Sequence, residues 1–219
     1  MNKKLLIITG GKIDEDDLKD YLSTNKIDVI IAVDSGLIIA DQLGINVDHI
    51  VGDFDSTPIK IFNKYKDMPN IHVYSPIKDE SDTELALDLA KDLCLVKGIK
   101  QIDILGGTGN RIDHLLANIS LLSKTIDDDI STCIIDKKNK IYIKNSNFTI
   151  QKCKQYGDFI SLIPFSDNVY KLSLKGFKYE LQNKTLTKGN SLGISNEIIE
   201  DEGFVELEKG ILIVIESKD

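Results

Sequence analysis

The chain has 219 residues, of which 42% are hydrophobic and 28% are charged, so it is long enough to bury a core and too apolar to be a disordered protein. Its net charge of -8 argues against a nucleic-acid partner, because phosphate backbones are bound through clustered basic side chains. No stretch without a charged residue exceeds ten residues, which is too short for a membrane-spanning helix.

The amino-terminal residues and the cysteines both bear on location. The apolar run Leu5–Ile8 is short and is followed by acids, so it reads as a first strand and not as a signal peptide. The three cysteines, Cys94, Cys133 and Cys153, are far apart and form no CxxC pair, which is typical of buried thiols in a reducing compartment. We therefore expect a cytoplasmic protein with no membrane partner.

Short β-branched runs alternate with stretches of helical spacing from residue 3 to about residue 135. Most of these runs are apolar almost throughout, as parallel strands covered on both faces are. We predict a parallel α/β domain over residues 1–130. Its strand runs, the last of which lies just past that boundary, are Lys4–Ile8, Val29–Val33, His49–Val51, Ile71–Tyr74, Ile102–Leu105 and Cys133–Ile135.

Two of the intervening helices have readable starts. Ser81 with Glu84 three residues later is a capping-box pattern, and Asn110 precedes a second helical stretch. Both stretches carry apolar stripes that we expect to be core. The first stripe is Leu85, Ala86, Leu89, Leu93 and Val96, and the second is Ile112, Leu115, Leu116, Ile119 and Leu122.

The pattern changes after about residue 127, where no long helical stretch follows. Short alternating segments such as Ile141–Ile143 and Leu172–Leu174 are separated by glycines, which predicts an all-β sandwich, or alternatively a barrel, over residues 131–219. The closing run Ile211–Ile215 is continuous and predicts a strand buried on both faces or at an interface.

Acidic residues follow several of the predicted strands. Asp53 and Asp55 are two apart, so in an extended segment their carboxylates project to one side and can bind one hard cation. Asp34 and Asp82 lie at neighbouring strand ends, where ligands bind in open parallel sheets. Any one of these residues is more simply a capping aspartate, but four at successive strand ends favour a divalent metal site.

The segment Gly106–His114 is glycine-rich and opens a helix, an arrangement that suits an anion although it is no Walker A loop. It holds Arg111, the single arginine of the chain, whose planar fork suits phosphate oxygens but also suits a surface ion pair. Asp113 is either a helix cap or a residue that orients Arg111 or a metal-bound water. His114 has no zinc-ligand spacing, and a structural role is expected for it.

These segments together resemble the thiamine pyrophosphokinase family, and the resemblance covers nearly the whole chain. A departure is the lack of tryptophan, which that family often places near the thiamine rings. The matching segments are Asp34–Gly36, Gly52–Ser56, Lys78–Leu87 and Gly106–His114 for the nucleotide part, and Gly157–Pro164 and Gly189–Glu197 for the thiamine-binding β domain.

The resemblance implies a Mg²⁺-dependent enzyme that transfers the pyrophosphoryl group of ATP to the hydroxyl of thiamine, giving thiamine diphosphate and AMP. It also implies a homodimer with a shared active site. It assigns Asp53, Asp55 and Asp82 to the metal, and Asp82, Arg111 and Asp113 to catalysis, with either aspartate as the proton acceptor. It assigns Asp34, Ser81, Gly107, Gly109, Asn110 and Arg111 to the nucleotide, and Ser195 and Asn196 to thiamine from the partner chain.

Two other functions fit the same residues. One is an ATP-dependent transferase for another alcohol, because the pocket that selects the alcohol lies in the less distinctive β part. The other is a regulator that binds nucleotide and metal without turnover. The presence of Asp53, Asp55, Asp82, Arg111 and Asp113 together favours the enzyme.

Overall fold

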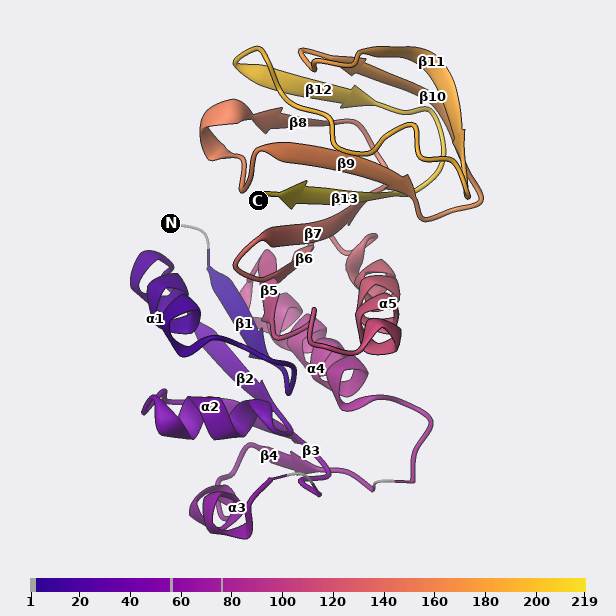
Figure 1. Ribbon diagram of the computed structural model, residues 1–219. Helices are drawn as coiled ribbons and strands as arrows, with labels where there is room; N and C mark the ends of the chain where they lie inside the picture. The colour runs from indigo at the N-terminus through magenta and orange to yellow at the C-terminus, as the bar shows by residue number, and fades with distance from the viewer. Residues whose placement is uncertain (1–2, 56, 76) are drawn as a thin grey trace. The chain divides into compact units, whose positions relative to one another are not determined.

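The computed structural model describes residues 3–55, 57–75 and 77–219. It divides into two compact units, Met1–Asp136 and Lys137–Asp219. Figure 1 shows helices only in the first unit, apart from short 3₁₀ turns, and mainly strands in the second. Ser56, the last residue of the acidic motif Gly52–Ser56, lies outside the described residues.

The N-terminal unit is built on a sheet of parallel strands in the order β4-β3-β2-β1-β5-β6. Leu5–Ile8 are fully buried, so this central strand is covered on both faces, which explains its continuous apolar run. All six predicted strands are confirmed. Their bounds are β1 (Lys4–Ile8), β2 (Val29–Val33), β3 (His49–Gly52), β4 (Ile71–Val73), β5 (Gln101–Leu105) and β6 (Ser131–Ile135).

A helix follows each of the first five strands. The cap predicted for α4 is confirmed, because the Ser81 hydroxyl accepts a hydrogen bond from the Glu84 backbone N–H at 3.2 Å. The helix ends at Gly98, which is left-handed with φ 64°. No described helix combines the length and apolar character that a membrane crossing needs. The bounds are α1 (Glu15–Thr24), α2 (Gly36–Gln42), α3 (Ile59–Tyr65), α4 (Asp82–Lys97) and α5 (Ile112–Leu121), followed by the 3₁₀ turn Leu122–Thr125.

The expected core face of α4 is confirmed only in part. The helix contacts β1 and β2 and buries Ala86, Leu87, Ala90 and Cys94, whereas the side chain of Val96 is 85% exposed. Of the expected stripe, Ala86 is buried and Leu85, Leu89 and Leu93 are half-buried. Ala86 and Ala90 are one turn apart, and their small side chains let the helix backbone approach the sheet. The buried face is therefore rotated from the predicted stripe toward Leu87, Ala90 and Cys94.

The expected core stripe that runs along α5 is exposed at its start and buried at its end. Ile112 is 72% and Leu116 60% exposed, whereas Leu115 and Ile119 are half-buried and Leu122 is 1% exposed. The buried residue within the helix itself is Asn118. The helix N-cap is Arg111, which makes no side-chain capping bond, instead of the predicted Asn110. The side of α5 that carries Ile112 and Leu116 is therefore a surface.

The boundary between the units falls after residue 136 instead of the expected residue 130. The physical reason is β6, which pairs in parallel with β5. Gln101 lies opposite Ser131 at one end of this ladder, and Leu105 lies opposite Ile135 at the other. This strand completes the first sheet and cannot be separated from it without breaking that ladder.

The C-terminal unit is all-β, as predicted, with antiparallel pairing between its strands. β13 lies between β7 and β9, and a separate four-stranded sheet has the order β11-β10-β12-β8. The predicted final strand is confirmed, with Leu212 and Val214 buried and Ile213 half-buried. The bounds are β7 (Asn139–Lys144), β8 (Phe148–Gln151), β9 (Phe159–Pro164), β10 (Asn168–Lys175), β11 (Leu181–Thr187), β12 (Glu202–Glu206) and β13 (Leu212–Ser217), with a 3₁₀ turn at Lys152–Lys154.

The expectation of buried thiols holds for two of the three cysteines. None of the three described cysteines is in a disulfide bond, and Cys94 and Cys133 are buried, but Cys153 is exposed beside β8. Burial raises the pKa of the Cys94 thiol to about 11, so it is protonated at neutral pH.

Candidate active site

A cavity of about 390 Å³ lies at the carboxyl ends of β1, β2 and β5 in the N-terminal unit. The loops that follow these strands form it together with the first residues of α4 and α5. All six residues predicted to bind the nucleotide line this cavity, namely Asp34, Ser81, Gly107, Gly109, Asn110 and Arg111.

Glycines allow the strand-end loops to approach one another. A Cβ on Gly11 would lie 1.9 Å from the Gly106 carbonyl oxygen, and one on Gly36 would lie 2.2 Å from the Ile8 carbonyl oxygen. The backbone N–H of Thr9 and its hydroxyl both donate to the Leu105 carbonyl, at 2.9 Å and 3.2 Å. Backbone atoms in direct contact therefore form and fix this part of the cavity.

Asn118 holds the glycine loop in place. It lies on α5, is buried, and its Nδ2 donates to the Gly107 carbonyl oxygen at 2.8 Å. Sequence reasoning missed this residue, although a lone amide within an apolar helical stripe was a usable signal. His114, expected to be structural, is exposed on the same helix and lines the cavity.

Two helix N-termini face this cavity, since Ser81–Thr83 of α4 and Arg111 of α5 line it. Unsatisfied backbone N–H groups and the helix dipole give each terminus partial positive charge. The arrangement therefore favours an anion in the cavity.

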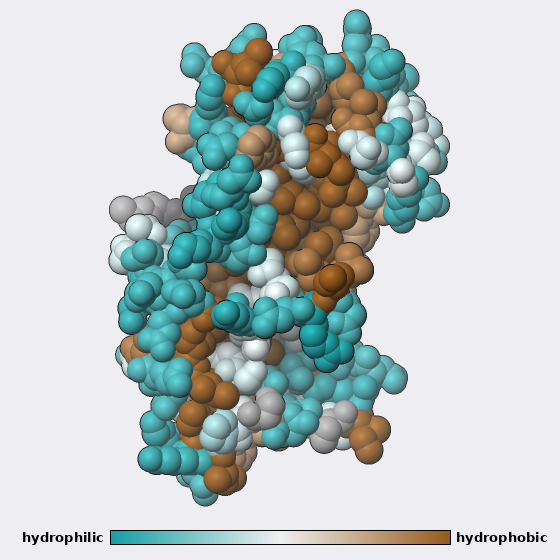
Figure 2. Space-filling model, viewed as in Figure 1, coloured by the Kyte–Doolittle hydropathy of each residue, from teal (hydrophilic) through white to brown (hydrophobic). Residues whose placement is uncertain are grey.

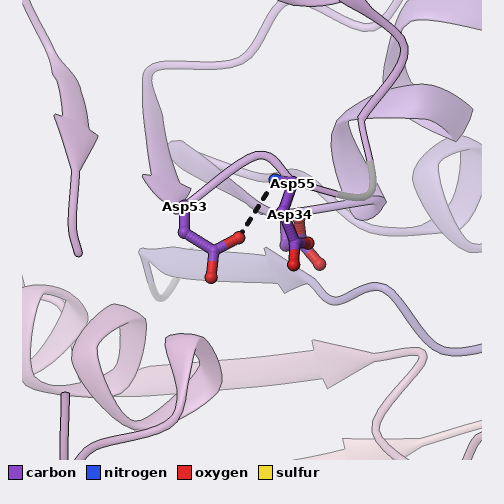
Figure 3. A group of neighbouring side chains, drawn as sticks. All are labelled: Asp34, Asp53 and Asp55. Carbon is purple, nitrogen blue, oxygen red and sulfur yellow. Dashed lines mark hydrogen bonds between the residues drawn. The ribbon is translucent and has the colours of Figure 1, made fainter. Parts of the chain in front are cut away.

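A cluster of carboxylates lies beside it. One carboxylate oxygen from each of Asp34, Asp53 and Asp55 lies within 4.8 Å of the others (Figure 3). The Asp55 backbone N–H donates to Asp53 Oδ1 at 3.1 Å, which ties these two residues together. Oxygens at such separations suit a single hard cation such as Mg²⁺, whose oxygen ligands lie about 2.1 Å from the ion.

The conformation of this loop differs from the extended segment expected from the sequence. Phe54 is left-handed with φ 62°, and its ring is buried 5.2 Å from the ring of Phe62. Asp34 is left-handed as well, with φ 48°. The buried Phe54 side chain anchors a tight turn, and this turn brings the two flanking carboxylates together.

Asp82, predicted as the third metal ligand, does not belong to this cluster of described residues. It begins α4, lines the cavity, and binds Lys78 Nζ through Oδ1 at 2.6 Å. Asp34, which the sequence assigned to the nucleotide, is the third member of the cluster, and the metal role of Asp82 stays a prediction.

Arg111 and Asp113 form a two-point ion pair. Arg111 Nη2 donates to Asp113 Oδ2 at 2.6 Å and Nε donates to Oδ1 at 3.2 Å, with both side chains exposed. This contact raises the pKa of Arg111 and lowers the pKa of Asp113, so both groups are charged at neutral pH. Of the roles left open for Asp113, the structure shows contact with Arg111.

The two residues predicted to bind thiamine differ in exposure. Ser195 is exposed and left-handed with φ 55°, and its backbone N–H donates to Ser161 Oγ at 3.0 Å. Asn196 is buried, and its amide oxygen accepts from the N–H groups of Tyr179 and Glu197, both at 3.0 Å. Its Nδ2 donates to the Tyr179 carbonyl at 2.8 Å. The Asn196 side chain thus fixes the loop that presents Ser195.

Comparison with known proteins gives matches in both units. The sequence model described as thiamin pyrophosphokinase, catalytic domain, matches residues 21–134, and the one described as thiamin pyrophosphokinase, vitamin B1 binding domain, matches residues 146–212. The chain belongs to the thiamine pyrophosphokinase family. The gap between the two matched ranges contains the boundary between the two units.

Individual relatives of the family agree over the full length. The thiamine pyrophosphokinase of Bacillus subtilis is 40% identical over 220 residues, covering 99% of this chain and all of the relative. A crystal structure of the B. subtilis enzyme matches with a TM-score of 0.83 at 39% identity, covering 99% of each chain. The thiamin pyrophosphokinase structure from Geobacillus thermodenitrificans has a TM-score of 0.81 at 31% identity, covering 99% of this chain and 98% of that one.

Proposed function

We propose that the cavity at the ends of β1, β2 and β5 is where this thiamine pyrophosphokinase transfers the pyrophosphoryl group of ATP to thiamine, giving thiamine diphosphate and AMP. One observation carries the proposal. Asp34 both lines the cavity and belongs to the carboxylate cluster with Asp53 and Asp55. A site for phosphate and a site for a hard cation are therefore contiguous, as phosphoryl-group transfer requires.

The donor set fits magnesium, because the cluster offers oxygen ligands from three carboxylates within 4.8 Å of one another. Asp34, Asp53 and Asp55 would hold the ion, and Asp82, which lines the cavity from the first turn of α4, would join them. When bound, Mg²⁺ neutralises charge on the phosphate oxygens.

Arg111 and Asp113 complete the reacting end of the cavity in this proposal. Asp113 holds the Nε and Nη2 edge of the guanidinium, which orients Arg111 toward a phosphoryl group. Either Asp82 or Asp113 accepts the thiamine hydroxyl proton. Both carboxylates sit in ion pairs, and a weak base is sufficient because the transition state of phosphoryl transfer is loose.

The C-terminal unit is proposed to be the thiamine-binding β-sandwich. Ser195 would contact thiamine, and Asn196 would act by holding the Ser195 loop through its three hydrogen bonds. Leu192 and Ile194 precede Ser195 in this loop and are each 50% exposed. Figure 2 shows apolar residues gathered over β9 and β13 of this unit.

A homodimer with a shared site is proposed as well. Its support is the exposed apolar side of α5, where Ile112 and Leu116 are largely uncovered. In a dimer the partner chain would cover this helix next to the cavity. Leu116→Lys should therefore shift the protein toward a monomer in size-exclusion chromatography with light scattering, and an unchanged dimer would contradict this placement.

The test of the reaction is AMP release from ATP and Mg²⁺ with and without thiamine, followed by a check for thiamine diphosphate. Thiamine-dependent AMP, matched one for one by thiamine diphosphate, is the expected result. ADP would show single-phosphate transfer instead. Thermal stabilisation by ATP without AMP formation from any alcohol would support a regulator.

A further inference from the structure

Lys12 lines the cavity at the ends of β1, β2 and β5, and no sequence motif had pointed to it. It follows the Thr9–Gly11 turn at the end of β1 and lines the same cavity as Asp34, Asn110 and Arg111. The side chain is exposed, and it makes no ion pair or hydrogen bond with any part of the chain that the structure describes.

The backbone that carries Lys12 is firmly placed. Gly11, its neighbour, is in contact with the Gly106 carbonyl, where even a Cβ would clash at 1.9 Å. Thr9 is bonded to Leu105 through both its backbone N–H and its hydroxyl. The Lys12 ammonium group thus extends from a rigid turn on the wall formed by the loops after β1 and β5, so little backbone ordering would be lost on binding.

The charges around the cavity show why this lysine is available to a ligand. Arg111, the other lysine or arginine that lines the described part of the cavity, is held by Asp113. Lys78 is held by Asp82 at 2.6 Å. Lys12 is therefore the cavity cation whose ammonium hydrogens are not already given to a carboxylate of the described chain.

We propose that Lys12 binds non-bridging oxygens of the nucleotide's polyphosphate chain and so is a binding residue of this site. The proposal rests on the proposed nucleotide-binding function of the cavity. An ammonium group donates up to three hydrogen bonds and adds one positive charge to a site whose other walls carry Asp34 and Asp82. Its role is in affinity for the phosphates and not in the transfer step.

The test compares Lys12→Met, which keeps the length and removes the charge, with Lys12→Arg, which keeps the charge. Lys26→Met is the matched control, because Lys26 is also exposed, has no partner among the described residues and lies away from the cavity. Binding of ATP and of inorganic pyrophosphate is measured by calorimetry at two salt concentrations. Melting temperature without ligand shows whether each variant is folded.

We expect Lys12→Met to weaken both ligands by roughly tenfold and to reduce the salt dependence of binding, with Lys12→Arg close to the parent protein. The KM for ATP should rise with little change in kcat. Equal affinity and equal salt dependence in Lys12→Met and Lys26→Met would overturn the proposal. Failure of the parent protein to form AMP while it still binds ATP would contradict the proposed reaction alone, because the Lys12 comparison is made on binding.

Discussion

In the N-terminal unit the candidate site residues follow parallel strands, and Asp34, Asp82 and Arg111 line a cavity with charged groups. In the C-terminal unit the loop that holds Ser195 presents uncharged exposed residues, among them Leu192, Ile194 and Ser195, while the Asn196 side chain is buried and bonded to backbone. The N-terminal cavity offers charged groups to a ligand, whereas the C-terminal loop offers an uncharged surface that the Asn196 hydrogen bonds hold in place. Substitutions in the two regions should therefore fail in different ways, one in turnover and the other in stability.

The largest effect is expected at the carboxylate cluster. Asp55→Asn removes one negative oxygen from the group with Asp34 and Asp53, so turnover should fall by about a hundredfold or more and the Mg²⁺ concentration for half-maximal activity should rise. Steady-state assays across a magnesium titration measure both. Asp67→Asn, at an exposed aspartate outside the cluster, is the control, and equal activity of the two variants would remove Asp55 from the metal site.

Asn196→Ala should act mainly on stability. The change leaves the N–H groups of Tyr179 and Glu197 and the Tyr179 carbonyl without their partner, at a cost of about 2–3 kcal/mol in the free energy of unfolding. Urea denaturation measures this cost. Ser195→Ala should leave stability unchanged and raise the KM for thiamine. A large stability loss in Ser195→Ala and none in Asn196→Ala would contradict these assignments.

Arg111→Lys tests whether the Arg111–Asp113 pair contributes to turnover. Charge is retained, but the two-point contact with Asp113 is lost, so kcat should fall by about tenfold while the melting temperature barely changes. The pair is exposed, and for that reason stability is not expected to depend on it. Unchanged kcat would make Arg111 a surface residue.

The smallest effect is expected from a pair of histidines on the neighbouring strands β3 and β4. His49 Nδ1 on β3 lies 3.5 Å from His72 Nε2 on β4. Burial lowers the pKa of His49, and the charges of His72 and Lys97 act in the same direction, against Asp48. The unfolded chain then binds the proton more readily, so this contribution to stability is complete above about pH 6.5 and is lost below it.

Melting temperatures at about pH 7.5 and about pH 5.5 test this sign. His49→Gln should show a smaller drop on acidification than the parent protein, whereas His114→Gln on exposed α5 should show the parent's drop. If both variants lose the same amount as the parent, the histidine pair does not contribute to the pH dependence of folding.

Much of the parallel sheet could be predicted because burial on both faces leaves continuous apolar runs such as Leu5–Ile8. The convergence of Asp34, Asp53 and Asp55 also followed from the meeting of parallel strand ends at one edge. The ion pair of Asp82 with Lys78 was not predicted, although the start of α4 was, because Lys78 lies in the loop before the helix and the sequence pattern does not show the course of that loop. The left-handed turn at Phe54 was not predicted either, because burial of the Phe54 ring determines this turn and no local sequence signal does.

The helix faces and the loop of Ser195 and Asn196 show a second limit. Periodicity placed Ala86 correctly on the buried face of α4, but it also placed Val96 there, whereas the sheet covers Leu87 and Ala90. Asn196 carries an amide that can bind a ligand or a backbone, and only its surroundings decide between the two. The sequence shows where polar and charged side chains stand, but it does not show whether those side chains already form hydrogen bonds with other groups of the protein.

The direct backbone contacts at Gly11 and Gly36 limit how this enzyme can be altered by directed evolution. No single substitution at either position keeps the present cavity wall, because even alanine would collide with a carbonyl oxygen. At Gly10 an added methyl group would meet only the Ser35 hydroxyl, which a change at Ser35 can remove. Substitutions that change the nucleotide preference should therefore accumulate at Ser35, Lys12 and Asn110, which line the cavity, while Gly11 and Gly36 remain unchanged.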